Sequence, residues 1–298
     1  MRRTFSVLLL FVFLSTPVLT QDKVELLTEE DLVSFDNPPA DTRIKYGDDP
    51  LQFGDLRVPE GDGPHPVAIF IHGGCWLAEY DISHTNKIAA ALARNGIATW
   101  SLEYRRVGND GGGWPGTYLD IGYGADHLRS LADLYNLDLG RVITMGHSAG
   151  GHLAIWLAAR LTIPDASEIS AEHPIPIGGV LALTPAPDLG GLHEQQVCGH
   201  VIDGLMGGSP EQYPERYRWG DPMQLPVEGV PQIIIVGKYD NDWTPSGLAY
   251  FNVAEERGDN IRLIEATESG HFEVIDPDSS TWNIVLDEAW ELLQSGIP

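Results

Sequence analysis

The sequence predicts an α/β fold, a mostly parallel central sheet flanked by helices. From Leu51 onward, short apolar runs alternate with longer segments of helical periodicity, which is the pattern of a parallel sheet with crossover helices. The chain has 298 residues, 43% of them hydrophobic and 20% charged, and can bury a sizeable core. Because no stretch has the composition of a linker, we expect one domain over 51–298, preceded by an extension at 21–50.

The first predicted elements of the domain are a buried strand and an amphipathic helix. Residues 67–71 are an apolar, β-branched run that predicts a strand, and His72-Gly73-Gly74 follows at once. In 85–95 the apolar residues fall on one helical face, and Gly96 supplies the stop. Residues 97–102 then form the next predicted strand.

A glycine-rich loop separates this strand from the middle of the domain. Residues 103–119, with Trp114 among several glycines, cannot form a helix or an inner strand. A helix is expected to begin at Thr117 or Asp120 and to run to about Tyr135.

The later elements alternate in the same way. Strands are predicted at 141–145, 179–183, 232–236 and 261–264, and helices at 151–161, 245–257 and 279–293. Residues 184–230 are irregular and rich in Pro, Gly and aromatic residues. This segment is long enough to form a small cap over a pocket, although an excursion packed against the sheet edge also fits.

The N-terminus has the composition of a signal peptide. Arg2 and Arg3 precede an apolar run at 7–14, and 15–20 is small or helix-breaking, so we expect residues 1–20 to be removed near Thr20. The apolar run is too short for a membrane anchor, since a spanning helix needs about 20 apolar residues. The expected location is therefore secreted or periplasmic, without membrane association after removal.

The charge balance excludes one class of partner. Asp and Glu number 43 against 18 Lys and Arg, a formal net charge of -25. Such a surface repels phosphate backbones, so a nucleic acid is not expected as a partner. The expected partner is a small-molecule substrate.

Two cysteines, Cys75 and Cys198, occur in a chain that is expected to meet an oxidising compartment. Either a single disulfide or two buried thiols fits this number. His193 and His200 flank Cys198, but their spacing matches no zinc pattern, and no metal or organic cofactor is implied.

The strongest chemical signal is Gly146-His147-Ser148-Ala149-Gly150, a G-x-S-x-G motif between a predicted strand and a predicted helix. A sharp strand-to-helix turn needs small residues two positions before and after the serine, and it exposes the serine hydroxyl above the sheet. Ser148 is therefore the predicted nucleophile.

A serine hydroxyl needs a base to take its proton and an acid to orient that base. In proteins that carry this strand-to-helix serine turn, the three residues follow one another along the chain in the order Ser, acid, His. Asp240 follows the predicted strand at 232–236, with Asp242 as its rival. His271 follows the last predicted strand, after a glycine that frees the loop. We expect Asp240 and His271 to fill these roles.

Backbone N–H groups must also stabilise the charged intermediate. Ala149 follows the nucleophile and is expected to supply one, while Gly74 and Cys75, in the turn after the strand at 67–71, are expected to supply the others. Trp76 and Trp114 are candidates for lining the substrate pocket, and either is equally compatible with a place in the core.

With these residues in place, the chain resembles the esterase and lipase branch of the α/β-hydrolase superfamily, especially its arylformamidase-like and carboxylesterase-like members. The resemblance covers almost everything from Leu51 onward and rests on HGGCW at 72–76, GHSAGG at 146–151, GKYD ending at Asp240 and GHFEVIDP at 270–277. It implies a single α/β-hydrolase domain that cleaves small carboxylic esters through an acyl-serine intermediate. An arylformamidase-type amidase and a binding protein that retains the fold without turnover are the alternatives.

Overall fold

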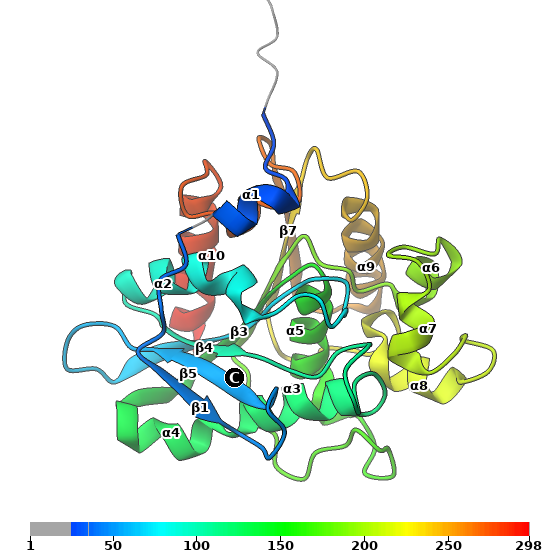
Figure 1. Cartoon of the computed structure of the whole chain (residues 1–298), viewed down its shortest axis with the longest axis horizontal. Coiled ribbons are helices and arrows are strands. Elements are labelled where there is room, and N and C mark those ends of the chain that lie inside the picture. The colour runs from blue at the N-terminus through cyan, green and yellow to red at the C-terminus, as the bar shows by residue number, and fades with distance from the viewer. Residues whose placement is uncertain (1–24, 35, 298) are drawn as a thin grey trace, which may run out of the picture.

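The computed structural model describes residues 25–34 and 36–297 of the chain, so the predicted signal peptide at 1–20 lies outside the described residues. The described residues form an eight-stranded sheet of order β1-β2-β4-β3-β5-β6-β7-β8 (Figure 1). The strands are β1 (Thr42–Lys45), β2 (Phe53–Arg57), β3 (His65–Ile71), β4 (Ala98–Leu102), β5 (Leu137–His147), β6 (Gly179–Leu183), β7 (Gln232–Gly237) and β8 (Ile261–Ala266).

The pairing is parallel from β4 to β8 and antiparallel where β1 meets β2 and β2 meets β4. The predicted mostly parallel sheet is therefore confirmed. Because strands β3, β5, β6, β7 and β8 run in the same direction, the loops that follow them leave the sheet at one edge, where catalytic loops of such sheets gather.

Helices cover both faces of the sheet. The α-helices are α1 (Glu29–Ser34), α2 (Asn86–Arg94), α3 (Gly116–Asp126), α4 (Leu128–Tyr135), α5 (Ala149–Ala159), α6 (Leu189–Glu194), α7 (Val201–Met206), α8 (Pro214–Gly220), α9 (Thr244–Arg257) and α10 (Trp282–Ser295). Short 3₁₀ helices are η1 (Ile82–Thr85), η2 (Arg160–Thr162), η3 (Pro222–Gln224) and η4 (Glu273–Ile275).

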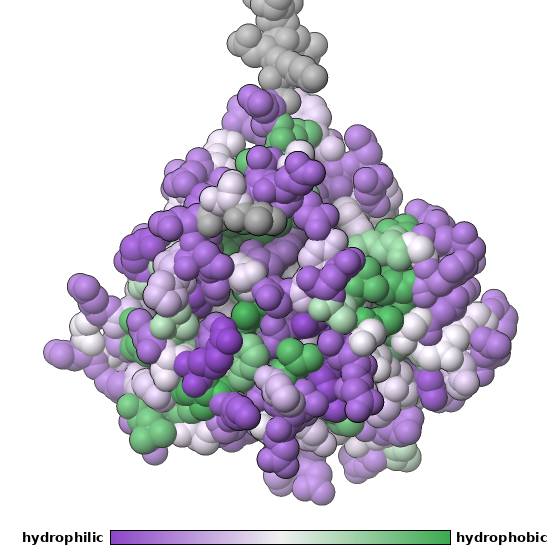
Figure 2. Space-filling model, in the orientation of Figure 1, coloured by the Kyte–Doolittle hydropathy of each residue, from purple (hydrophilic) through white to green (hydrophobic). Residues whose placement is uncertain are grey.

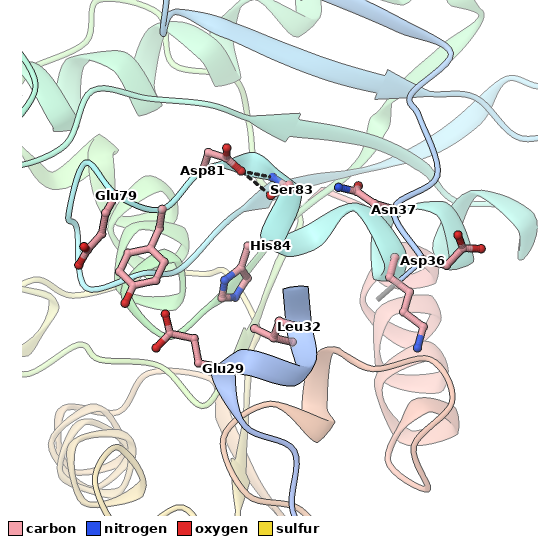
Figure 3. Close-up of a pocket in the computed structure, with 10 residues that line it drawn as sticks. Glu29, Leu32, Asp36, Asn37, Glu79, Asp81, Ser83 and His84 are labelled. Carbon is pink, nitrogen blue, oxygen red and sulfur yellow. Dashed lines mark hydrogen bonds between the residues drawn. The ribbon is translucent and has the colours of Figure 1, made fainter. Parts of the chain in front are cut away.

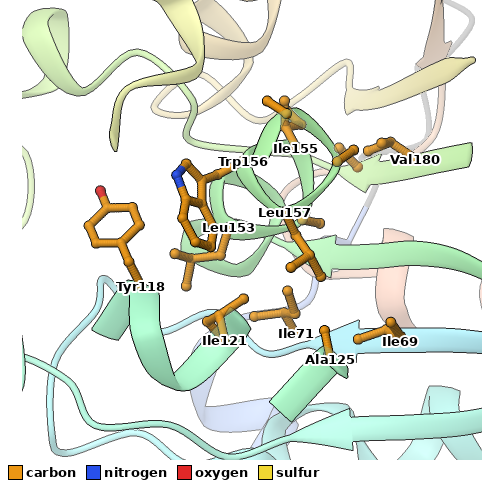
Figure 4. Close-up of a cluster of buried hydrophobic side chains, with 14 of the residues drawn as sticks. Ile69, Ile71, Tyr118, Ile121, Ala125, Leu153, Ile155, Trp156, Leu157 and Val180 are labelled. Carbon is orange, nitrogen blue, oxygen red and sulfur yellow. The ribbon is translucent and has the colours of Figure 1, made fainter. Parts of the chain in front are cut away.

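Two buried apolar clusters lie on opposite faces of the sheet because side chains alternate along each strand. Ile69 and Ile71 of β3 pack in the larger cluster with α3 and α5, whereas Ala68 and Phe70 pack in the other with α2 and α10. Helix α5 is buried along its whole length and packs against the sheet and against α3, whose Ile121 and Ala125 lie beside Ile71 and Ile69 of β3 (Figure 4). It begins directly after the predicted nucleophile and so anchors that residue in the rigid centre of the molecule.

The helix expected from Thr117 or Asp120 to Tyr135 is two helices, α3 and α4, divided at His127. The carbonyl of Gly124 accepts a hydrogen bond from the indole N–H of Trp100 at 2.7 Å, and His127 stacks on the same indole. A continuous helix would use that carbonyl to accept the N–H of Leu128. A contact from β4, distant in sequence, thus interrupts a locally helical pattern.

The sheet begins before the expected domain start at Leu51. Strand β1 lies within the segment described from sequence as an extension, and it pairs with β2. Arg43 of β1 forms an ion pair with Asp55 of β2, with an N–O distance of 2.8 Å. Strand β2 carries buried charge at Asp55 and Arg57, and in β1 only every second residue is partly buried. Neither strand has the apolar run of the other strands, so the sequence pattern did not reveal them.

Residues 184–230 form α6, α7, α8 and η3, and they pack beside the sheet together with α9 (Figure 1). Leu189, Leu192 and Leu205 are buried in the larger apolar cluster. Among the described residues, none of this segment lines the cavity at Ser148, so of the two arrangements that the sequence left open, the excursion beside the sheet is the one found. Its apolar side chains are used to extend the core.

Hydrophilic side chains predominate on the face drawn in Figure 2, and hydrophobic ones gather in separate patches between them. Within the described ranges, no helix has both the length and the apolar character needed to cross a membrane.

Candidate active site

Ser148 occupies the sharp turn between β5 and α5. Its backbone has φ 54° and ψ -121°, a conformation that non-glycine residues rarely adopt and that is commonly held at functional sites. A Cβ at Gly146 would lie 2.1 Å from the Gly150 carbonyl oxygen, and a Cβ at Gly150 would lie 2.1 Å from that of Ile71. The G-x-S-x-G spacing is therefore required by close backbone packing, as the motif predicted.

His271 lies on the loop between β8 and η4 and is paired with a carboxylate from the end of β7. Its Nδ1 is 2.7 Å from Oδ2 of Asp240, while Oδ1 of the same carboxylate accepts the N–H of Trp243 at 3.1 Å. Asp242, the rival acid, is exposed and has no contact of this kind. Since a carboxylate accepts at Nδ1, the neutral ring carries its proton there and leaves Nε2 free to accept one.

Ser148 and His271 line one cavity of about 120 Å³. The turn after β3 closes one side of this cavity with Gly74 and Cys75, both of which were predicted at the site. The other lining residues are Glu29, Tyr80, His84, His147, Trp243 and Phe272. The structure thus brings together side chains from segments as far apart as α1 and the loop after β8.

The turn after β3 places backbone donors beside the serine. Gly74 has φ 100° and Cys75 φ 49°, and a Cβ at Gly73 would lie 3.1 Å from the Cβ of Ser148. In the described part of the chain, the N–H groups of Gly74, Cys75 and Ala149 have no hydrogen-bond acceptor. Unpaired N–H groups at a helix start and a tight turn are suited to bind an oxyanion.

A disulfide ties this turn to the segment between α6 and α7. Cys75 and Cys198 are bonded, with their Cα atoms 6.3 Å apart, which decides between the two states that the sequence left open. His193 and His200, which flank Cys198, both face Asp203. The bond links the backbone beside Ser148 to a part of the chain that otherwise lies away from the cavity.

The buried carboxylate of Glu103 supports the turn after β3. Glu103 accepts hydrogen bonds from the N–H groups of Ile82 and Tyr104, at 3.0 Å each, and also pairs with His72 and Arg106. Burial acts to raise the pKa of Glu103, but the nearby His72 and Arg106 outweigh it and lower that pKa to about 2. The carboxylate therefore stays charged and holds the residues on both sides of the turn.

The two tryptophans considered for the substrate pocket lie elsewhere. Trp76 is 1% exposed, and its indole N–H donates to Nδ1 of His152 at 3.2 Å, so it belongs to the core. Trp114 lines a different surface cavity, where its indole N–H donates to Glu168 at 2.8 Å. Of the two places that the sequence left open for each tryptophan, neither side chain lines the cavity at Ser148: that of Trp76 packs in the large apolar cluster and that of Trp114 lies at the surface near α8.

Trp243 is the aromatic residue that the sequence analysis missed. Its ring stacks on His271, with centroids 5.6 Å apart and an interplanar angle of 25°. It follows Asp240 by three positions in the GKYDNDW segment, so proximity to the predicted acid was the available signal. Tyr80 and His84 had no comparable signal, because Tyr80 lies in a loop and His84 in the short helix η1, and the path of both depends on tertiary packing.

Two further imidazoles lie beside His271. Nε2 of His147 is 2.8 Å from the backbone carbonyl oxygen of His271, and Nε2 of His84 is 2.8 Å from Nδ1 of His147. Burial, with the neighbouring imidazoles, lowers the pKa of His147 well below its usual value and that of His84 to about 3. Both rings are therefore neutral at ordinary pH.

A second cavity of about 380 Å³ adjoins the first and shares Glu29, Tyr80 and His84 with it. Figure 3 shows Glu29 from α1 and His84 from η1 facing the same space. Burial, together with Glu29, raises the pKa of Tyr80 to about 12, so its hydroxyl stays protonated. The shared residues connect a small space at Ser148 to a larger one beneath α1.

Together with a matching family model and esterase relatives, this arrangement of sheet, serine turn and histidine loop identifies the α/β-hydrolase superfamily, in its esterase and lipase branch, and the predicted resemblance is confirmed. Residues 55–245 match the family model described as BD-FAE, and the chain belongs to that family.

Two curated relatives illustrate the similarity. Esterase LipC of Mycobacterium tuberculosis is 25% identical over 203 residues, which is 65% of this chain and 49% of the relative. Isoprenylcysteine alpha-carbonyl methylesterase ICME of Arabidopsis thaliana is 31% identical over 37% of this chain and 26% of its own length. The chain spans about half the length of the first of these relatives, and less of the second.

Solved structures share the fold over nearly the whole described chain. A carbohydrate esterase from gut microbiota, in truncated form, superposes with a TM-score of 0.71 at 21% identity, covering 86% of this chain and 99% of the other. Esterase B from Lactobacillus Rhamnosis gives a TM-score of 0.74 at 21% identity, covering 89% of each chain.

Proposed function

We propose that this protein is a serine hydrolase that cleaves small carboxylic esters through an acyl-serine intermediate, with Ser148, His271 and Asp240 as its catalytic triad. The observation that carries the proposal is the cavity in which a strained serine and a histidine hydrogen-bonded to a buried carboxylate occur together. The names of relatives and structural neighbours, which include several esterases, support the same chemistry.

In the first half of the reaction, the Oγ of Ser148 attacks the ester carbonyl carbon while Nε2 of His271 takes the hydroxyl proton. The oxyanion is stabilised by N–H groups of Ala149, Gly74 and Cys75. The intermediate collapses, the C–O bond to the alcohol breaks, and His271 gives its proton to the departing oxygen. Asp240 holds the ring in the required tautomer throughout.

In the second half, water attacks the acyl carbon and His271 takes one of its protons. The bond to Ser148 Oγ then breaks, the serine regains the proton, and a carboxylic acid leaves. The cavity at Ser148, about 120 Å³, suits a short acyl group, and the adjoining cavity of about 380 Å³ offers space to a larger alcohol part.

The test is kinetic and uses p-nitrophenyl acetate, p-nitrophenyl octanoate and N-formylkynurenine with the same preparation. We expect the acetate ester to be cleaved most efficiently and Ser148→Ala to lower its kcat by about 10⁴-fold or more. N-formylkynurenine serves as the contrasting amide. Its preferential cleavage would favour an amidase, and undiminished turnover by Ser148→Ala would exclude the mechanism.

We also propose that the protein is secreted or periplasmic. The disulfide between Cys75 and Cys198 supports this, because such bonds persist in oxidising compartments. Expression with and without residues 1–20, followed by fractionation and counting of free thiols, tests the proposal. Export of both forms in equal amounts would contradict it.

A further inference from the structure

The backbone of His271 is held at its carbonyl oxygen by two donors from the sheet. Nε2 of His147, the last residue of β5, donates at 2.8 Å, and Oγ1 of Thr184, just after β6, donates at 3.3 Å. The side chain of the same residue is held by Asp240 after β7. His271 lies on a loop, so these contacts from three strand ends are what fix its position relative to Ser148.

His147 is itself oriented by a second imidazole. Nε2 of His84, on η1, is 2.8 Å from Nδ1 of His147, and the two ring centroids are 5.0 Å apart. A carbonyl oxygen can only accept, so the proton of His147 must be on Nε2, which leaves Nδ1 as an acceptor. His84 must then carry its proton on Nε2. The tautomers of both rings follow from the single carbonyl at the end of the chain of hydrogen bonds.

The surroundings leave little room for another arrangement. His147 is fully buried, and its ring lies 4.5 Å from that of His271 and 5.9 Å from that of Phe272, between centroids. A Cβ at Gly73 would lie 3.2 Å from Nδ1 of His147, so the absence of a side chain at this position in the turn after β3 leaves space for the His147 ring. The serine, the oxyanion turn and the histidine loop thus all touch His147.

We propose that His147 and His84 are positioning residues for the reaction: neutral imidazoles that hold the backbone of His271, and with it the catalytic ring, at the distance from Ser148 that proton transfer requires. The inference rests on the proposed function and adds to it a role for the variable residue of the G-x-S-x-G motif. Because His147 sits directly before Ser148, it couples the base to the nucleophile through one hydrogen bond.

The hydrogen bond from His147 to the carbonyl oxygen of His271 affects the rate through the position of the catalytic ring. A displacement of about 1 Å in a catalytic group can cost about 100-fold in rate, whereas substrate binding is hardly affected. Loss of the hydrogen bond is therefore expected to lower kcat and to leave KM nearly unchanged. The rings remain neutral when His271 takes up its proton, since both pKa values are held low.

The variants are His147→Leu, His147→Gln, His84→Leu and the double change to leucine. His147→Leu should lower kcat on p-nitrophenyl acetate by about 10–100-fold with KM within about twofold. His147→Gln should recover most of the loss, because its amide N–H can reach the position of Nε2. The double variant should be no slower than His147→Leu, since both residues act through one bond. His200→Leu, at an exposed histidine near α7, is the matched control and should have the wild-type kcat.

The inference is overturned if folded His147→Leu keeps kcat within about twofold of wild type, or if His147→Gln is as slow as His147→Leu. Its failure differs from failure of the proposed function, which would appear as turnover that survives Ser148→Ala. A measurement on the unaltered protein does not depend on variants that fold. Nitrogen NMR of ¹⁵N-histidine-labelled protein should show the Nε2–H tautomer for both His147 and His84, and an Nδ1–H tautomer at His147 would contradict the proposal.

Discussion

At the scale of single residues, the cavity at Ser148 depends on residues that have different structural roles. Trp243 stacks on the ring of His271, and its backbone N–H donates to the Asp240 carboxylate that holds this ring. Gly146 and Gly150 let backbone segments approach closely enough to present the serine. Trp114, in contrast, belongs to another cavity near α8.

This difference between two tryptophans gives a direct prediction. Trp243→Ala should lower kcat/KM on p-nitrophenyl acetate by about tenfold, because it removes a wall of the cavity and the packing on His271. Trp114→Ala should leave kcat and KM each within about twofold of the wild-type value. Steady-state kinetics on the two variants decides the matter, and a larger effect of Trp114→Ala would restore the sequence-based assignment.

The sequence indicated Ser148, Asp240 and His271 because each follows a strand in the chain order that the mechanism needs, and the structure brings the first and last to one cavity. The pattern held no signal for His84 or Tyr80. Their place depends on how the loop after β3 folds over the sheet. It also did not separate an aromatic core residue from a pocket residue, since Trp76 and Trp243 both stand beside predicted catalytic loops.

At the scale of elements, the turn after β3 is held from two sides. The buried carboxylate of Glu103 supports it from within, and the disulfide to Cys198 anchors it to the segment between α6 and α7. Because Cys75 contributes one of the proposed oxyanion N–H groups, the disulfide constrains a catalytic backbone atom as well as the fold.

Removing the disulfide should therefore affect both rate and stability. Cys198→Ala is expected to lower kcat by about tenfold, less than the roughly 10²–10³ for loss of a whole oxyanion donor, and to reduce the free energy of unfolding by about 2–5 kcal/mol. Kinetics and chemical denaturation of this variant provide the measurement.

The matched control for the disulfide is the double variant Cys75→Ala/Cys198→Ala, which should behave like Cys198→Ala. Treatment of the wild type with a phosphine reductant, verified by thiol counting, should reproduce the loss in rate. Full activity of the reduced protein would show that the turn holds its shape without the bond.

Elements with simple apolar patterns were the predictable ones. Strands β6 and β7 have the expected start residues because they are buried runs bounded by turn residues. Strand β1 was missed because only every second residue is partly buried, and α3 and α4 were merged because the break depends on Trp100. The path of 184–230 depends on contacts with the core, which local sequence does not encode.

At the scale of the whole molecule, buried neutral histidines make stability depend on pH. His152 is fully buried; its Nε2–H donates to the Gly220 carbonyl at 2.8 Å, and burial lowers its pKa to about 4. The unfolded chain takes up this proton at about pH 6.5. The stabilisation is therefore complete above pH 6.5 and is lost as pH falls toward about 4.

Each such histidine should add a slope of about 1.4 kcal/mol per pH unit in this window. The free energy of unfolding of the wild type should fall between pH 6.5 and pH 4.5, and His152→Gln should show a slope smaller by about that amount. Denaturant titrations at several pH values measure it. Equal slopes for the two proteins would mean that His152 is protonated in the folded state.

Labelling of the intact protein with a fluorophosphonate probe, followed by peptide mapping, tests the proposed nucleophile without knowledge of the natural substrate. The probe should modify the wild type at Ser148 alone and abolish ester cleavage, and Ser148→Ala should remain unlabelled. Modification at another residue, or unreduced ester cleavage after complete labelling of Ser148, would contradict the proposed mechanism.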